Sequence, residues 1–408
     1  MSRSTSLAIP NADALYERAL SCLPGGNSRS TLFVPPHPPY AARGEGALLT
    51  DVDGHELIDL QNNYTSLVHG HAFKPAIEAA AVAMQAGPSV GLPTQSEIEL
   101  AELLAQRMPW APSWRFANSG TEAVMIALRG ARAATGRDGF LRFAGCYHGT
   151  YDAVVQEGAR GVPAAAHQDV VSVPVGDSEA FTRALEEHGE SLAAVLLDIL
   201  PNRAGLRPPD PDFILTVREQ TRRRGILLIV DEVITFRLAT GGLQQEYGVE
   251  ADLVTLGKLI GGGFPVGALG GSAAVMDVFD PHLDDAVGHG GTFSANPVTM
   301  SAGLASLRAL DEGAIERINR LGDRLRQELA SQGHAVSGRG SLLRLHPADP
   351  TRLWWELYEQ GVLISANGLA CMSTPMDDST VERALAAFAR VARDASPAPE
   401  PKAKDAHV

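Results

Sequence analysis

Residues 226–233 read Ile-Leu-Leu-Ile-Val-Asp-Glu-Val, and residues 253–263 read Leu-Val-Thr-Leu-Gly-Lys-Leu-Ile-Gly-Gly-Gly. Each stretch begins with a short apolar run and then turns to charged residues or glycine. Such runs predict strands that are buried on both faces, as in a parallel sheet covered by helices. Asp231 and Lys258 follow the ends of two such strands, and this edge of an open α/β sheet is where ligands bind.

Further apolar runs on the N-terminal side of this stretch predict more strands of the same sheet. They alternate with helical patterns or glycine-rich loops, which favours an α/β fold with a mainly parallel sheet. The six predicted strands are Trp114–Ala117, Phe140–Phe143, Val170–Val173, Ala193–Leu197, Ile226–Val230 and Leu253–Leu256. Before them, Asp53-Gly54 between two apolar runs predicts a hairpin of residues 47–52 and 56–60.

The C-terminal part predicts a smaller α+β unit, with strands near 342–345 and 362–364 and several helices. We therefore expect four segments. Residues 1–50 are an N-terminal segment that packs with the small domain, 51–296 the large α/β domain, 297–395 the small domain, and 396–408 a disordered tail rich in Pro, Ala and charge.

Composition restricts the classes of function. The 408 residues carry a net charge of −14, which disfavours nucleic acid and anionic membranes as partners. The three cysteines lie far apart and form no disulfide framework or metal motif, and no apolar run approaches the ~18 residues of a membrane span. We expect a cytoplasmic protein. His69 and His71 have no further ligand at suitable spacing, so we expect no metal site.

Three local patterns carry chemistry. Asn118-Ser-Gly-Thr-Glu-Ala123 follows a strand and opens a helix, where backbone N–H groups and hydroxyls suit a phosphate; an ordinary Ser/Thr helix cap is the alternative. Asp231 can keep a pyridine nitrogen protonated or simply cap a loop. Lys258 can be desolvated and form a Schiff base or lie solvated on the surface. Their order along the chain is what one cofactor would require.

Five motifs together resemble the pyridoxal-phosphate (PLP) enzymes of fold type I, and more narrowly the class III aminotransferases in the branch of glutamate-1-semialdehyde aminomutase. The similarity extends from about Leu23 to Val391. The motifs are NSGTEA (118–123), GCYHG (145–149), LLIVDEV (227–233), TLGKLIGGGFPVGALGG (255–271) and GTFSANP (291–297).

This resemblance implies a PLP cofactor, a seven-stranded type of sheet and a homodimer with shared active sites. It implies that Lys258 binds PLP as a Schiff base and that Asp231 pairs with the pyridine nitrogen. Val233 and Tyr147 would pack on the two ring faces, with His148 beside Tyr147 as a structural or catalytic group. The phosphate would be bound by Ser119, Gly120 and Thr121, and by Thr292 from the neighbouring subunit.

Two departures from the family bear on the substrate. Relatives read Glu-Pro where this chain has Asp198-Ile199, and the aminomutases carry an acidic residue where residues 365–372 have none. The second departure argues against aminomutase activity.

The N-terminal segment and Tyr64-Thr65 are similar to the β-amino-acid (β-phenylalanine-type) aminotransferases of this branch. Arg29 would bind the donor carboxylate through two parallel hydrogen bonds. Tyr64, Val68 and Leu369 would form an apolar wall. Rival carboxylate-binding residues are Arg237, Arg203 and Arg207.

We therefore expect transfer of the amino group of an aryl or alkyl 3-amino acid to a 2-oxo acid by a ping-pong mechanism. Two alternatives remain open: intramolecular amino transfer as in the aminomutases, and an ω- or α-amino-acid transaminase.

Overall fold

The structure, a computed structural model, describes residues 7–391, and the predicted tail at 396–408 lies outside them. The chain forms two compact units. One is Lys74–Ile315, and the other combines the residues up to Phe73 with those from Glu316 onward. Within the described residues, no helix has the length and apolar character needed to cross a bilayer.

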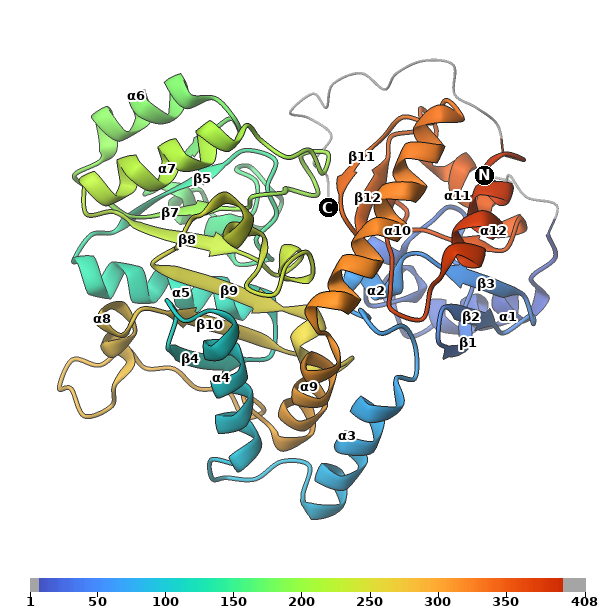
Figure 1. The fold of residues 1–408 in the computed structure, drawn as a ribbon, viewed down its shortest axis with the longest axis horizontal. Coiled ribbons are helices and arrows are strands. Elements are labelled where there is room, and N and C mark those ends of the chain that lie inside the picture. The colour runs from blue at the N-terminus through green and yellow to red at the C-terminus, as the bar shows by residue number, and fades with distance from the viewer. Residues whose placement is uncertain (1–6, 392–408) are drawn as a thin grey trace. The chain divides into compact units, whose positions relative to one another are not determined.

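The unit Lys74–Ile315 is built on a seven-stranded sheet (Figure 1). Along the sheet the order is β4-β10-β9-β8-β7-β5-β6, and only β10 runs antiparallel to its two neighbours, β4 and β9. The strands are β4 (Ser113–Ala117), β5 (Gly139–Phe143), β6 (Val170–Val173), β7 (Leu192–Leu197), β8 (Leu227–Asp231), β9 (Leu253–Gly257) and β10 (Gly267–Gly271). This mixed sheet, parallel from β9 to β6, confirms the predicted α/β class.

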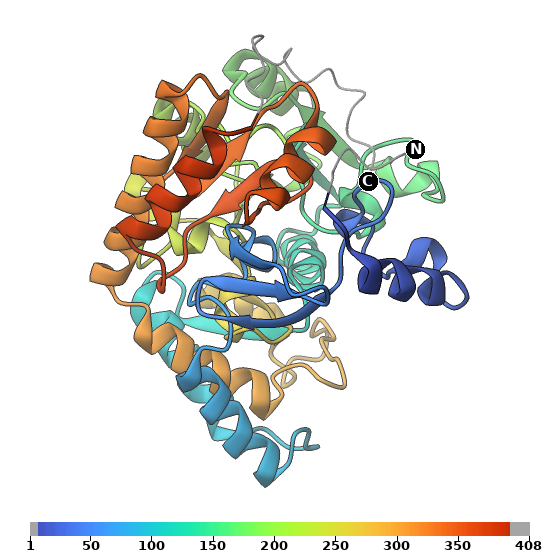
Figure 2. The same ribbon diagram turned by 90° about the vertical axis from the view of Figure 1, so that its right-hand side faces the viewer.

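Helices of the same unit pack on this sheet and on each other. α5 packs against β4, β7, β9 and β10, and α7 packs against β8. α3 and α9 lie side by side, as both views show (Figures 1 and 2). The helices are α3 (Lys74–Ala86), α4 (Gln95–Arg107), α5 (Gly120–Thr135), α6 (Ser178–His188), α7 (Pro211–Arg223), α8 (Ala273–Met276) and α9 (Pro297–Ala309).

The other unit contains two small sheets. One joins β1 (Ala41–Glu45), β2 (Leu48–Asp51), β3 (Glu56–Asp59) and β13 (Val362–Leu363), and the other joins β11 (Val336–Arg339), β12 (Leu342–Leu345) and β14 (Leu369–Cys371). Its helices are α1 (Pro10–Leu20), the four-residue turn α2 (Asn62–Thr65), α11 (Pro350–Glu359) and α12 (Asp378–Phe388), with α10 (Glu312–Ser331) entering it from the other unit.

The six strands predicted for the large sheet are present, each within one residue of its predicted ends. The two compact units divide at 73/74 and 315/316, whereas the sequence predicts domain boundaries at 50/51 and 296/297. The hairpin β2–β3 groups with the C-terminal part because β3 pairs in parallel with β13, where Val362 is opposite Ile58. The two strands expected in the small domain, β12 and β13, belong to different sheets.

Candidate active site

Asp231 is the last residue of β8, and its buried carboxylate has several partners. Oδ1 accepts hydrogen bonds from the Val233 amide at 3.1 Å and the Thr255 hydroxyl at 3.2 Å. Oδ2 lies 2.7 Å from Nδ1 of His148, whose ring is also buried. These partners hold the carboxylate in one orientation.

Lys258 follows β9, the strand next to β8, and begins the 3-10 turn η7 (Lys258–Gly261) with a φ of 50°. Burial lowers the pKa of its amine, while the carboxylates of Asp231 and Asp198 oppose that shift. Helix α9 packs against η7, and a Cβ at Gly303 would lie only 2.1 Å from the Ile260 carbonyl oxygen. The lysine therefore stands on a tightly supported turn with its amine beside two acids.

The N-terminus of α5 lies next to these strand ends. Ser119 is the N-cap, and its hydroxyl accepts from the Glu122 amide at 3.2 Å. Ser119 therefore caps the helix, as the alternative interpretation predicted. A Cβ at Gly120 would lie 3.1 Å from the Val233 side chain. The first turn of a helix presents unpaired amides that suit an anion.

The loop 145–149 supplies Tyr147 and His148. The Thr150 amide donates to Thr121 Oγ1 at 3.3 Å, which attaches this loop to the start of α5. Tyr147 is exposed, and the Arg203 guanidinium lies over its ring, 4.0 Å from the centroid. His148 Nε2 is buried and has no hydrogen-bond partner among residues 7–391. Arg203 thus contacts Tyr147, a residue expected to pack on the cofactor. The sequence predicted Arg203 only as a rival carboxylate-binding residue, not in this contact.

Two further buried acids belong to this region and were not among the predicted site residues. Burial raises the pKa of Asp198, at the end of β7, to about 7, with Asp231 adding to the shift. Burial likewise raises the pKa of Glu232 to about 7, although its carboxylate accepts from Thr235 Oγ1 and from the amides of Leu243 and Gln244. Asp231 was predicted because it is an acid at the end of a strand, and Asp198 meets the same criterion.

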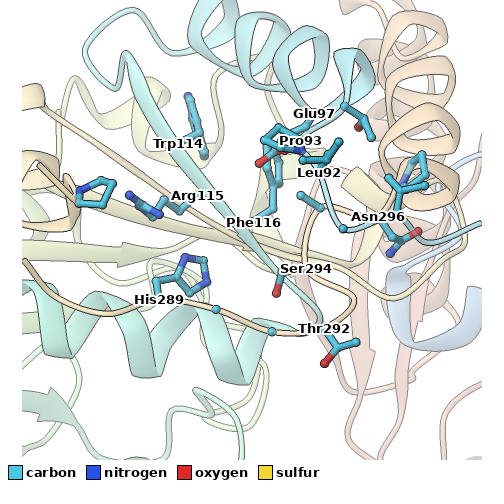
Figure 3. Close-up of a pocket in the computed structure, with 18 of the residues that line it drawn as sticks. Leu92, Pro93, Glu97, Trp114, Arg115, Phe116, His289, Thr292, Ser294 and Asn296 are labelled. Carbon is cyan, nitrogen blue, oxygen red and sulfur yellow. The ribbon is translucent and has the colours of Figure 1, made fainter.

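Thr292 and Arg237 lie in segments whose neighbouring residues contact this cluster. Asn118 donates to Ser294 Oγ, and Thr235 donates to Glu232. Thr292 is exposed in the loop before α9 and lines a pocket of about 810 Å³ (Figure 3). Trp114, Arg115, His289 and Leu92 line the same pocket. Arg237, in the 3-10 turn η5 (Thr235–Arg237), is fully buried.

The remaining predicted residues belong to the other unit. Arg29 is exposed, donates from Nη1 to Asn63 Oδ1 at 2.9 Å and lies over the Tyr64 ring at 5.5 Å. Val68 and Leu369 are buried. His69 Nδ1 lies 2.9 Å from Thr374 Oγ1, and His71 Nε2 lies 2.7 Å from Asp59 Oδ2.

The donor set of the unit Lys74–Ile315 fits PLP. An amine with a lowered pKa suits the aldehyde, a buried carboxylate held by His148 suits the ring nitrogen, and the amides and hydroxyls at the start of α5 suit the phosphate. Glycines at 120 and 257 leave the space beside Val233 without side chains, since a Cβ at Gly257 would lie 3.5 Å from Val233.

Comparisons with known proteins show which family the chain is similar to. The chain is 41% identical over 351 residues to the glutamate-1-semialdehyde 2,1-aminomutase of Methanothermobacter thermautotrophicus, covering 82% of this chain and 83% of the relative. It is 38% identical over 404 residues to the beta-phenylalanine transaminase of Variovorax paradoxus, covering 93% and 92%. A solved transaminase with PLP bound superposes with a TM-score of 0.91 at 40% identity, covering 94% of this chain and 97% of that one. Residues 34–388 match the family Aminotransferase class-III, and the chain therefore belongs to this family of PLP-dependent aminotransferases.

Proposed function

We propose that this class III aminotransferase transfers the amino group of a β-amino acid, with an aryl or alkyl side chain, to a 2-oxo acid. The observation that carries the proposal is the Arg29 guanidinium held over Tyr64, an exposed cation beside an aromatic ring. The similarity to the Variovorax transaminase over 93% of the chain supports it. Segment 365–372, which contains no acid, supports an apolar donor side chain.

Lys258 and Asp231 carry the chemistry in this proposal. PLP, when bound, supplies an electron-withdrawing ring that lowers the barrier to breaking a C–H bond. Lys258 anchors PLP, and its amine, once freed by the donor, moves the proton from the amine-bearing carbon. The lowered pKa of Lys258 keeps more of this amine unprotonated and able to accept a proton. Asp231, oriented by His148 and Thr255, keeps the ring nitrogen protonated.

The remaining residues bind and orient. Ser119, Gly120 and Thr121 bind the phosphate, and Val233 and Tyr147 pack on the ring. Two half-reactions follow in a ping-pong cycle: the donor leaves as an oxo acid, and a 2-oxo acid then accepts the amino group.

Arg29 binds the donor carboxylate. In a β-amino acid the carboxylate lies one bond further from the amine-bearing carbon than in an α-amino acid. Arg237 is less suitable because it is fully buried, whereas Arg29 is exposed. Tyr64 offers an apolar surface to the donor side chain, whereas Val68 and Leu369, which the sequence predicts in the same wall, are only 1% exposed and are as unsuited to direct contact as Arg237.

Kinetics on matched isomers test the substrate. We expect kcat/KM for 3-amino-3-phenylpropanoate to exceed that for phenylalanine, with pyruvate or 2-oxoglutarate as the acceptor. Arg29→Ala should lower kcat/KM by roughly 2–4 kcal/mol equivalent, the effect of truncating one partner of a charge pair that the bound donor would cover. Preference for the α-isomer would return the assignment to the wider aminotransferase class.

Intramolecular amino transfer is the second candidate, favoured by the 41% identity to an aminomutase. It predicts turnover of a single amino-aldehyde without any acceptor. The same preparation tested on glutamate-1-semialdehyde, with and without a 2-oxo acid, separates the two reactions.

The proposal includes a cytoplasmic homodimer with shared active sites. Thr292 would reach the phosphate bound by the other subunit. Apolar side chains are exposed around the pocket that Thr292 lines, with Leu92 78% and Phe293 59% exposed, and a second copy would bury them.

A further inference from the structure

Four consecutive residues, none of them a glycine, have left-handed backbone conformations. Their φ angles are 46° at Asn62, 46° at Asn63, 55° at Tyr64 and 73° at Thr65. A left-handed residue costs roughly 1–2 kcal/mol, less for asparagine, and a β-branched threonine is an uncommon occupant. Such a backbone persists only where its surroundings hold it, and it concentrates at functional sites.

Two strands of the same unit hold this turn. Asp59, which ends β3, accepts at Oδ1 from the amides of Gln61 at 2.8 Å and Asn62 at 2.9 Å. The buried Asn62 side chain donates to the carbonyl oxygen of Cys371 in β14 at 3.0 Å. The backbone of the turn is therefore attached at its base, and Asn63 and Tyr64 are presented in defined positions.

Both presented residues contact Arg29. Asn63 Oδ1 accepts from Arg29 Nη1 at 2.9 Å, and the Tyr64 ring lies 5.5 Å from the guanidinium carbon. The Tyr64 hydroxyl donates to the Thr31 carbonyl, and the Arg29 amide donates to Asn27 Oδ1 at 2.9 Å. An exposed arginine loses rotamer freedom when it binds a ligand, and a side chain already held loses less.

We propose that Asn63 is the positioning residue for Arg29, and that the left-handed turn exists to present it. The amide accepts one of the five N–H groups of the guanidinium and leaves the others for a carboxylate. Because the Asn63 amide is neutral, it orients the Arg29 guanidinium without cancelling the positive charge of that group. The inference rests on the proposed function, in which Arg29 binds the donor carboxylate.

Binding of 3-phenylpropanoate to the holoenzyme, measured by calorimetry, tests the inference. This acid has the carboxylate and the aryl group but no amine, so it cannot react. Asn63→Gly removes the side chain and tolerates a φ of 46°. We expect its dissociation constant to rise about 5- to 10-fold, the effect of losing a hydrogen bond to a charged group at an exposed site. KM for the best donor should rise equally, with kcat within about twofold.

Two companion variants separate positioning from a structural role. Asn63→Asp keeps the acceptor oxygen but adds a charge that competes with the ligand for Arg29, so binding should weaken at least as much. Ser66→Ala removes a hydrogen bond to the Asn63 carbonyl oxygen in the same turn and should bind as wild type does. In an Arg29→Ala background, Asn63→Gly should change the dissociation constant less than twofold.

Each contrary outcome has a distinct meaning. If the effects of Arg29→Ala and Asn63→Gly multiply in the double variant, or if Asn63→Asp binds as tightly as wild type, Asn63 does not act through Arg29. If Arg29→Ala weakens binding and Asn63→Gly does not, the positioning role alone is lost. If Arg29→Ala leaves binding unchanged, the carboxylate site of the proposed function is wrong and this inference is overturned with it.

Discussion

Asp198 directly follows β7 and Asp231 ends the neighbouring strand β8, yet the two carboxylates have different hydrogen-bond partners. Asp231 accepts hydrogen bonds from Val233 and Thr255 and faces His148. Asp198 accepts from the Leu200 amide, and Asp231 repels its charge. Burial is the main reason why the pKa of Asp198 rises to about 7, and the repulsion from Asp231 adds to the rise. We infer that Asp198 holds a proton below neutral pH.

The raised pKa of Asp198 makes stability depend on pH. Between about pH 5 and pH 8 the folded protein releases a proton that the unfolded chain has already lost. The free energy of unfolding therefore falls as pH rises, by about 2–3 kcal/mol for this group. Asp198→Asn should match wild type near pH 5 and be more stable near pH 8, as measured by unfolding at both pH values. Asp138→Asn, at an exposed position, is the control, and a parallel decline in Asp198→Asn and wild type would contradict the assignment.

Lysine is rare in this chain, at positions 74, 258, 402 and 404. Borohydride reduction of the yellow holoenzyme should attach the cofactor to the peptide that contains Lys258, as detected by mass spectrometry. Lys258→Ala should lose turnover by roughly 10³-fold or more, because the proton-transfer group is gone. Lys74→Ala, at an exposed position, should behave as wild type. Wild-type turnover in the Lys258 variant would contradict the mechanism.

At the scale of elements, β10 shows what an apolar pattern cannot reveal. Its sequence, Gly267-Ala-Leu-Gly-Gly271, lacks the β-branched and aromatic residues typical of strands, and we did not predict it as one. The glycines are needed for packing: a Cβ at Gly267 would lie 2.0 Å from the Ser119 carbonyl oxygen, and one at Gly270 would lie 2.5 Å from the Trp114 ring. β10 can thus lie against the start of α5 only without side chains.

Gly267→Ala tests this close approach. The added methyl group should push β10 away from the N-terminus of α5, so we expect a loss of roughly 1–3 kcal/mol in stability and weaker PLP binding. Thermal unfolding and the dissociation constant of PLP measure the two effects. Gly313→Ala in α10 meets only Asp311 Oδ1 at 3.7 Å and should leave both unchanged. Normal PLP affinity in Gly267→Ala would show that β10 does not shape the phosphate site.

At the scale of the whole molecule, the exposed apolar surface around the pocket predicts association. Leu92→Asp places a charge where the proposed homodimer buries an apolar side chain that is 78% exposed in the monomer. We expect the dimer dissociation constant, measured by sedimentation, to rise at least about tenfold, since burying a leucine contributes about 1.5–3 kcal/mol. Activity should fall on dilution. Leu215→Asp, on α7, should remain dimeric, and a wild-type protein that is monomeric and active would exclude shared sites.

The sequence by itself determined the α/β class and the six strands around Asp231 and Lys258, and from it came the proposed order of the cofactor residues. These features follow from local patterns, since a buried strand needs an apolar run and a ligand site needs polar residues at its end. Only the tertiary structure decided that the hairpin β2–β3 groups with the C-terminal unit, that β10 is a strand and that Asn63 contacts Arg29. Pairing of Ile58 with Val362 joins residues about 300 positions apart, and although the sequence predicts a strand at each place, it does not predict that the two strands pair. Such contacts depend on how distant segments pack together, and no short stretch of sequence contains that information.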